Sequence, residues 1–151
     1  MKTEELMIGD CIKNTINHEY YISLEVAKLL KEAGFDWKCR GIYVLDSEND
    51  PEYIFSTANF TNTSKEIEGY IRLSAPTLEI AQRWLRVVKQ IHLYVRPILD
   101  EHKYVVTVVV DDLTWGQVND NNGTSKRFNT YEEAQEMGIK KAIEIILEKG
   151  E

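Results

Sequence analysis

The chain has 151 residues, of which 43% are hydrophobic and 28% charged, and its formal net charge is −7. The length is typical of one domain, and the composition is that of a folded globular protein rather than a disordered one. The acidic balance argues against a wholly basic nucleic-acid binder and against a polybasic membrane-surface protein. Two cysteines are too few for a disulfide scaffold.

The first residues do not have the pattern of a targeting segment. Residues 1–6 include two glutamates where a signal peptide has a basic stretch followed by an apolar one. No apolar run approaches the about 20 residues that a membrane-spanning helix needs. We therefore expect a cytoplasmic protein with reduced thiols and no membrane contact. Residues 1–22 are expected to form a strand segment ahead of a single domain at 23–151.

Two amphipathic helices are predicted in the first two thirds of the chain, each with strands after it. The first helix starts at Ser23, a good capping residue, and ends at Gly34, which suits a left-handed helix terminus. The second runs from about Thr77 to Ile91 and has Trp84 on its apolar side. Strands are expected at 42–45, 53–60, 68–73, 91–96, 104–110, 113–118 and 125–128.

The third helix opens with Thr130-x-x-Glu133, a capping box in which each side chain is expected to satisfy the other residue's free backbone amide. Gly138 lies on its apolar side, where a missing side chain permits close approach of a neighbouring element. Together these elements predict an α+β fold in which antiparallel sheets pack with three helices.

The three helix openings also resemble one another. They begin at residues 23, 77 and 130, spaced by 54 and 53 residues, and each has a hydroxyl residue, an early glutamate and an alanine. The spacing raises the hypothesis of a repeated helix-plus-hairpin unit of about 53 residues. The alternative is a generic helix opening, because those residue types favour that position energetically.

The most informative candidate site is on the strand that follows the second helix. Period-2 alternation places His92, Tyr94 and Arg96 on one strand face, where they could hold an anion or stack on a planar ligand. The alternative is the solvated outer face of a sheet. Cys39 is expected to be a buried, inert thiol despite its neighbours Lys38 and Arg40.

No catalytic residue, metal site or cofactor is predicted. The three histidines have no metal-ligand spacing, and phosphate-loop and nucleophile-elbow motifs are absent from the sequence. A nucleic-acid site is an alternative, because residues 77–129 carry a net charge of +1 in an otherwise acidic chain. Its contacts would be Arg83, Arg86, Lys89 and Arg96, in a helix–three-strand–helix order like that of double-stranded RNA-binding domains.

Three stretches carry a resemblance to a known family: ISLEVAKLLKEAGFDWKC, LSAPTLEIAQRWLR and RFNTYEEAQEMGIKKAIE. They resemble a family of small phage and prophage proteins from gut anaerobic bacteria, over about residues 22–149, with Ser74–Arg86 as the most specific block. The family has no established activity, so the resemblance implies a phage-associated accessory role and carries over no catalytic residue.

These observations predict a non-enzymatic accessory or protein-interaction protein of phage or prophage origin. Nucleic-acid binding, and a ligand-binding or enzymatic role of His92, Tyr94 and Arg96, are the alternatives. The strand at 104–110 is apolar on both faces, since Val105 and Val109 lie opposite Val106 and Val108. A strand of that kind needs cover on both sides, which raises the hypothesis of a homodimer.

Overall fold

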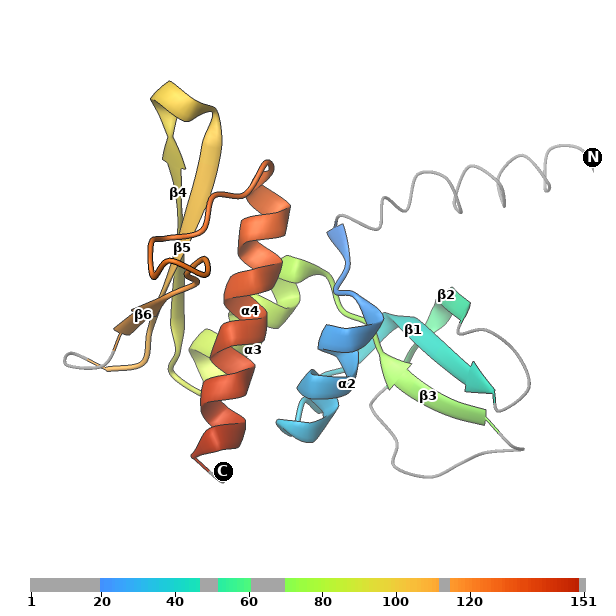
Figure 1. Cartoon of the computed structure of the whole chain (residues 1–151). Helices are drawn as coiled ribbons and strands as arrows, with labels where there is room; N and C mark the ends of the chain where they lie inside the picture. The colour runs from blue at the N-terminus through green and yellow to red at the C-terminus, as the bar shows by residue number, and fades with distance from the viewer. Residues whose placement is uncertain (1–19, 47–51, 61–69, 112–114, 150–151) are drawn as a thin grey trace, which may run out of the picture.

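The computed structural model describes residues 20–46, 52–60, 70–111 and 115–149 (Figure 1). The predicted α+β class is confirmed: three helices pack with two small antiparallel sheets. The elements in chain order are α2 (Leu24–Glu32), β1 (Cys39–Asp46), β2 (Glu52–Phe60), β3 (Tyr70–Ser74), α3 (Leu78–Val88), β4 (His92–Ile98), the 3-10 turn η2 (Leu99–Glu101), β5 (Lys103–Val109), β6 (Trp115–Gln117) and α4 (Tyr131–Glu148).

The helices lie between the two sheets (Figure 1). One sheet has the strand order β2-β1-β3 and the other β4-β5-β6. The long helix α4 is central: it contacts β4 and β5 on one side and both other helices, while α2 contacts β3 and α3 contacts β4. Both sheets therefore rest on one shared helical layer.

The predicted helix starts are confirmed at all three positions. Ser23, Thr77 and Thr130 are the N-caps, and each side chain accepts a hydrogen bond from a backbone N–H in the first turn. The second helix is shorter than predicted, because Gln90 adopts a left-handed φ of 59° and ends it. The N–H of Ile91 then turns back to the Leu85 carbonyl at 3.0 Å.

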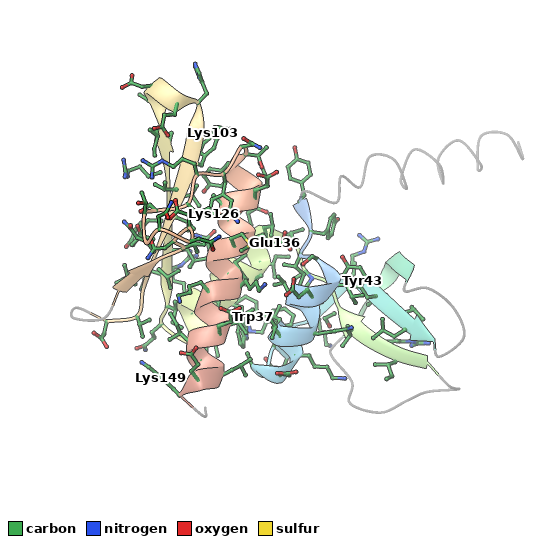
Figure 2. The ribbon with its side chains drawn as sticks, in the orientation of Figure 1. Trp37, Tyr43, Lys103, Lys126, Glu136 and Lys149 are labelled. Atoms are coloured by element: carbon green, nitrogen blue, oxygen red, sulfur yellow. The ribbon has the colours of Figure 1, made fainter. Side chains whose placement is uncertain are left out.

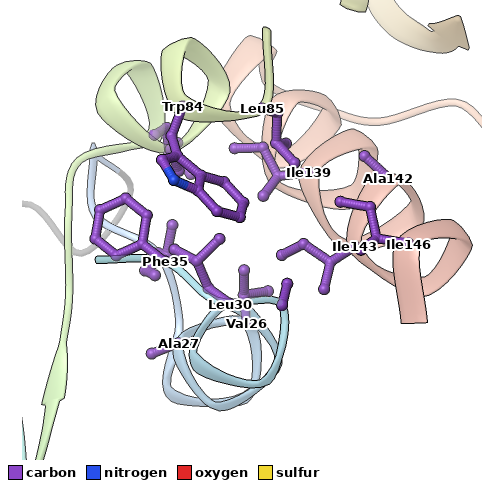
Figure 3. Close-up of a cluster of buried hydrophobic side chains, with 14 of the residues drawn as sticks. Val26, Ala27, Leu30, Phe35, Trp84, Leu85, Ile139, Ala142, Ile143 and Ile146 are labelled. Carbon is purple, nitrogen blue, oxygen red and sulfur yellow. The ribbon is translucent and has the colours of Figure 1, made fainter. Parts of the chain in front are cut away.

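The core is built mainly from the helices (Figure 3). Trp84 is 1% exposed, as its apolar position predicted, and packs edge-to-face on Phe35 with ring centroids 5.4 Å apart. Gly138 permits the close approach predicted for it, because a Cβ there would lie 2.6 Å from Cγ2 of Val106 on β5. The glycine lets α4 sit directly on the second sheet.

The repeat hypothesis finds no support in the described part of the chain, where no repeat is detected. Two of the helices do precede three-stranded sheets, but the central strand is the first of its sheet in one case and the second in the other. The similar openings reflect shared capping chemistry instead.

The predictions about membrane spans and about the N-terminal segment can also be compared with the structure. No helix of the described residues is long and apolar enough to cross a membrane. The strand segment expected at 1–22 lies mostly outside the described residues. Within it, Tyr21 forms an isolated antiparallel bridge with Thr77, and the N–H of Ile22 donates to the Pro76 carbonyl at 3.2 Å.

Candidate functional site

The candidate site is the face of the β4-β5-β6 sheet that points away from α3 and α4. The opposite face is buried: Leu93, Val106 and Val108 belong to the core under the helices. Because side chains alternate along a strand, their neighbours point the other way. We call the side that points away from α3 and α4 the outer face, and it consists of His92, Tyr94, Arg96, Val105, Thr107, Val109 and Gln117.

The outer face depends on the chain geometry at the two ends of β4. The left-handed Gln90 directs the chain from the end of α3 into β4, an edge strand. Pro97, near the end of β4, is tolerated there because an edge strand need not donate every backbone N–H. The hairpin to β5 turns through η2 and His102, which has a left-handed φ of 52°.

The strand register sets the outer-face residues in rows across the sheet. Tyr94 pairs with Thr107, and Thr107 pairs with Gln117, so an aromatic ring, a hydroxyl and an amide form the middle row. His92 pairs with Val109 in the row on one side, and Arg96 pairs with Val105 in the row on the other. The side chain of Gln117 also hydrogen-bonds to the Ser125 hydroxyl.

Exposure distinguishes β4 from β5 on this face. Tyr94 is 59% exposed, and His92 and Arg96 are also exposed. Val105 is only 2% exposed and Val109 is half-buried. His92, Tyr94 and Arg96 therefore share one face of β4, as predicted, and all three are exposed. They line neither of the two cavities described below.

Charge is unevenly distributed around the outer face. The strands β4, β5 and β6 contain His92, Arg96 and Lys103 but no aspartate or glutamate. The nearest carboxylates along the chain lie beyond the strand ends, at Asp100, Glu101 and Asp111, and Glu101 is paired with Arg127 at 3.1 Å. In a chain of net charge −7, the three strands that form this face thus carry no negative side chain of their own.

The four cations of the predicted nucleic-acid site do not form one surface. Arg83 and Arg86 are exposed on α3, which packs against the inner face of the sheet, whereas Arg96 is on the outer face. Lys89 lies over the Trp84 ring, with its Nζ 5.7 Å from the ring centroid. The sheet separates Arg96 from the helix cations that precede it in sequence.

A cavity of about 200 Å³ beside the start of α3 holds Cys39 in its wall. Tyr21, Lys38, Arg40 and Thr77 also line it. Cys39 is 5% exposed, and its thiol donates to the Gly41 carbonyl at 3.3 Å. Burial raises the pKa of the Cys39 thiol, and hydrogen bonds with Ser74 and Ala75 oppose that rise. The thiol is therefore buried, as predicted, and its raised pKa favours the protonated form.

A second cavity, of about 380 Å³, lies between the starts of α2 and α4. Tyr43 on β1 and Glu136 on α4 both line this cavity, and they lie on either side of the start of α2 (Figure 2). The Tyr43 hydroxyl donates to the Ile22 carbonyl at 2.7 Å, and the Ser23 N–H donates to Oε1 of Glu136 at 2.6 Å. Burial, aided by the charge of Glu136, raises the pKa of Tyr43 to about 12.

Sequence reasoning missed this second arrangement entirely. Ser23 and Glu136 are 113 positions apart, and no local pattern links them. Glu132 and Glu133 also line the cavity, but Glu133 serves the cap of α4 by accepting the Asn129 N–H at 3.2 Å. The described contacts of Tyr43, Ser23 and Glu136 tie α2 to α4 and β1, which is a structural role.

Among the described residues, no group of three or more histidine, cysteine, aspartate or glutamate side chains is placed to hold a metal ion. Comparisons of the chain with protein-family models, curated proteins and solved structures find no match. The resemblance to phage and prophage proteins therefore stays a prediction.

Proposed function

We propose that the protein is a non-enzymatic accessory protein of phage or prophage origin that acts by binding a partner macromolecule through the outer face. The observation that carries the proposal is the 59% exposure of Tyr94 between two exposed hydrogen-bonding side chains, His92 and Arg96, on a sheet face that no helix of the described residues covers. Tyrosine and arginine are enriched at binding surfaces, since each combines a large contact area with hydrogen-bond donors.

The position of the three side chains on one exposed edge strand supports binding over catalysis. Catalysis needs groups held around a substrate in a water-excluding site, as in a concave pocket. His92, Tyr94 and Arg96 instead project side by side from one edge strand. They can contact an extended partner together, but they do not enclose a small molecule.

Affinity capture with matched variants tests this proposal. Tagged wild-type protein, a Tyr94→Ala/Arg96→Ala variant and an Arg83→Ala/Arg86→Ala control would be incubated with lysate of the bacterium that carries the gene. We expect a partner that wild type and control enrich and that the outer-face variant loses by at least tenfold. Circular dichroism would verify that all three proteins are folded. A partner retained by the outer-face variant, or none enriched repeatedly, would contradict the proposal.

Homodimerisation remains a separate proposal. It rests on the apolar residues on both faces of β5. However, Val105 is buried within a single chain, at only 2% exposed. The need for a second subunit over the outer face is correspondingly smaller. Light scattering at tens of micromolar decides the matter: we would expect the mass of two chains, and the mass of one would end the dimer hypothesis.

A further inference from the structure

We propose that the partner of the outer face is single-stranded nucleic acid, with Tyr94 as a stacking platform for a base and His92 and Arg96 as contacts for the phosphates on either side. This inference rests on the proposed function and names the partner. It differs from the site suggested by sequence, because it uses one sheet face and not the helix cations Arg83 and Arg86.

The first argument is the shape of the middle row. The Tyr94 ring is 59% exposed on the outer face, and Thr107 and Gln117 follow it across the strands. Bases stack on exposed aromatic rings of sheets when they are not already stacked in a duplex. A hydroxyl and an amide beside the ring can hydrogen-bond to base edges. A duplex offers no free base plane, so this row suits a single strand.

The second argument is charge. Alternate residues on a strand are about 7 Å apart, so His92 and Arg96 flank the Tyr94 ring at about that distance along β4. Both are exposed donors, and the three strands contain no carboxylate that would repel a phosphate. Arg96 can pair with a negative charge, and the imidazole of His92 can donate a hydrogen bond to a second acceptor along β4. Nucleic acid supplies a chain of phosphates, with one negative charge per nucleotide.

The third argument is size. β4 and β5 have seven residues each and β6 has three. At about 3.3 Å per residue and about 4.8 Å between strands, the outer face covers about 300 Å². An area of that size accommodates a few nucleotides of an extended strand.

Fluorescence anisotropy with short labelled DNA and RNA single strands of mixed sequence, and with the matching duplex, tests the inference on the full chain. We expect the wild type to bind a single strand more tightly than the duplex at low salt. Tyr94→Ala should weaken that binding by about tenfold and Tyr94→Phe should not, because a stacked base contributes through the ring. Arg96→Ala should weaken binding and lower the salt dependence by about one counterion.

The control is Arg83→Ala/Arg86→Ala, which changes two exposed arginines on α3 and leaves the outer face intact. Its single-strand affinity should stay within twofold of the wild type. No binding at low salt, equal binding by Tyr94→Ala, or loss only in the control variant would overturn the inference. A captured partner that is a protein, resists nuclease and depends on Tyr94 would also overturn it, while leaving the proposed function standing.

Discussion

Gly138 shows how closely a single position is fitted in this protein. A Cβ at Gly138 would lie 2.6 Å from Cγ2 of Val106, a stiff, β-branched side chain that is 1% exposed. Overpacking of a core costs about 1–3 kcal/mol, whereas replacing a helical glycine by alanine returns about 1 kcal/mol. We therefore expect Gly138→Ala to lower the free energy of unfolding by up to about 2 kcal/mol, measured by urea denaturation.

The origin of that loss can be checked in the same experiment. Val106→Ala removes the methyl groups that meet the added Cβ, so Gly138→Ala should cost less in that background than in the wild type. The two changes should be coupled by at least about 0.5 kcal/mol. An additive pair of effects would show that the Gly138–Val106 contact does not limit the approach of α4 to β5.

Tyr43 gives a stability effect that depends on pH. Its pKa is raised to about 12 in the folded protein, by burial and by Glu136, from about 10 in an unfolded chain. Between these values the unfolded chain has lost the proton and the folded one has kept it. Rising pH therefore favours unfolding in this window, by up to about 1.4 kcal/mol per pH unit.

Comparison with Tyr43→Phe isolates that contribution. At neutral pH the variant should be less stable by about 1–2 kcal/mol, because the buried Ile22 carbonyl loses its donor. The phenylalanine does not titrate, so the stability difference should shrink as the pH rises from about 10 to about 12. Urea unfolding at several pH values measures it. A difference that stays constant would refute the raised pKa.

At the scale of elements, the capping of α4 is the clearest local determinant. Thr130 Oγ1 accepts the Glu133 N–H at 3.1 Å, while Glu133 accepts the Asn129 N–H. Half of the predicted capping box is therefore confirmed: Thr130 caps the Glu133 amide, but Glu133 accepts from Asn129, the residue before the cap, and not from Thr130. Thr130→Ala should lower the unfolding free energy by about 1 kcal/mol, and Thr130→Ser should restore it. An unchanged thermal midpoint for Thr130→Ala would contradict this expectation.

The helix starts could be predicted because capping chemistry acts over three or four residues. The sheets could not be assembled in the same way, since pairing joins distant segments. β1 pairs with both β2 and β3 and so becomes the central strand, and nothing in its own sequence indicates that. The end of α3 was also placed wrongly, because apolar periodicity continued to Ile91 while Gln90 turned the backbone.

The candidate site could likewise be predicted only in part, from the local pattern of one strand. Alternation alone places His92, Tyr94 and Arg96 on one face of β4. It does not say which face the helices cover, and that depends on the packing of α3 and α4. Closeness in sequence then misleads, because Arg86 and Arg96 are near neighbours along the chain but lie on opposite sides of the sheet.

At the scale of the whole molecule, the helical layer joins the two sheets into one core. The main cluster of buried residues includes Tyr43 and Leu73 from the first sheet and Leu93 and Val108 from the second, with residues of all three helices between them. α4 contacts both of the other helices and the second sheet. If the helices unfold, both sheets expose their inner faces to solvent. We therefore expect the two sheets not to unfold separately.

A matched pair of substitutions tests this cooperativity. Leu73 and Leu93 come from different sheets and are 3% and 6% exposed, and Leu→Ala in a core costs about 2–5 kcal/mol. In a two-state molecule either change lowers the whole transition, with the same midpoint by tryptophan fluorescence and by far-ultraviolet circular dichroism. Two transitions, or a midpoint that shifts for only one probe, would mean that the sheets unfold as separate units despite the helices they share.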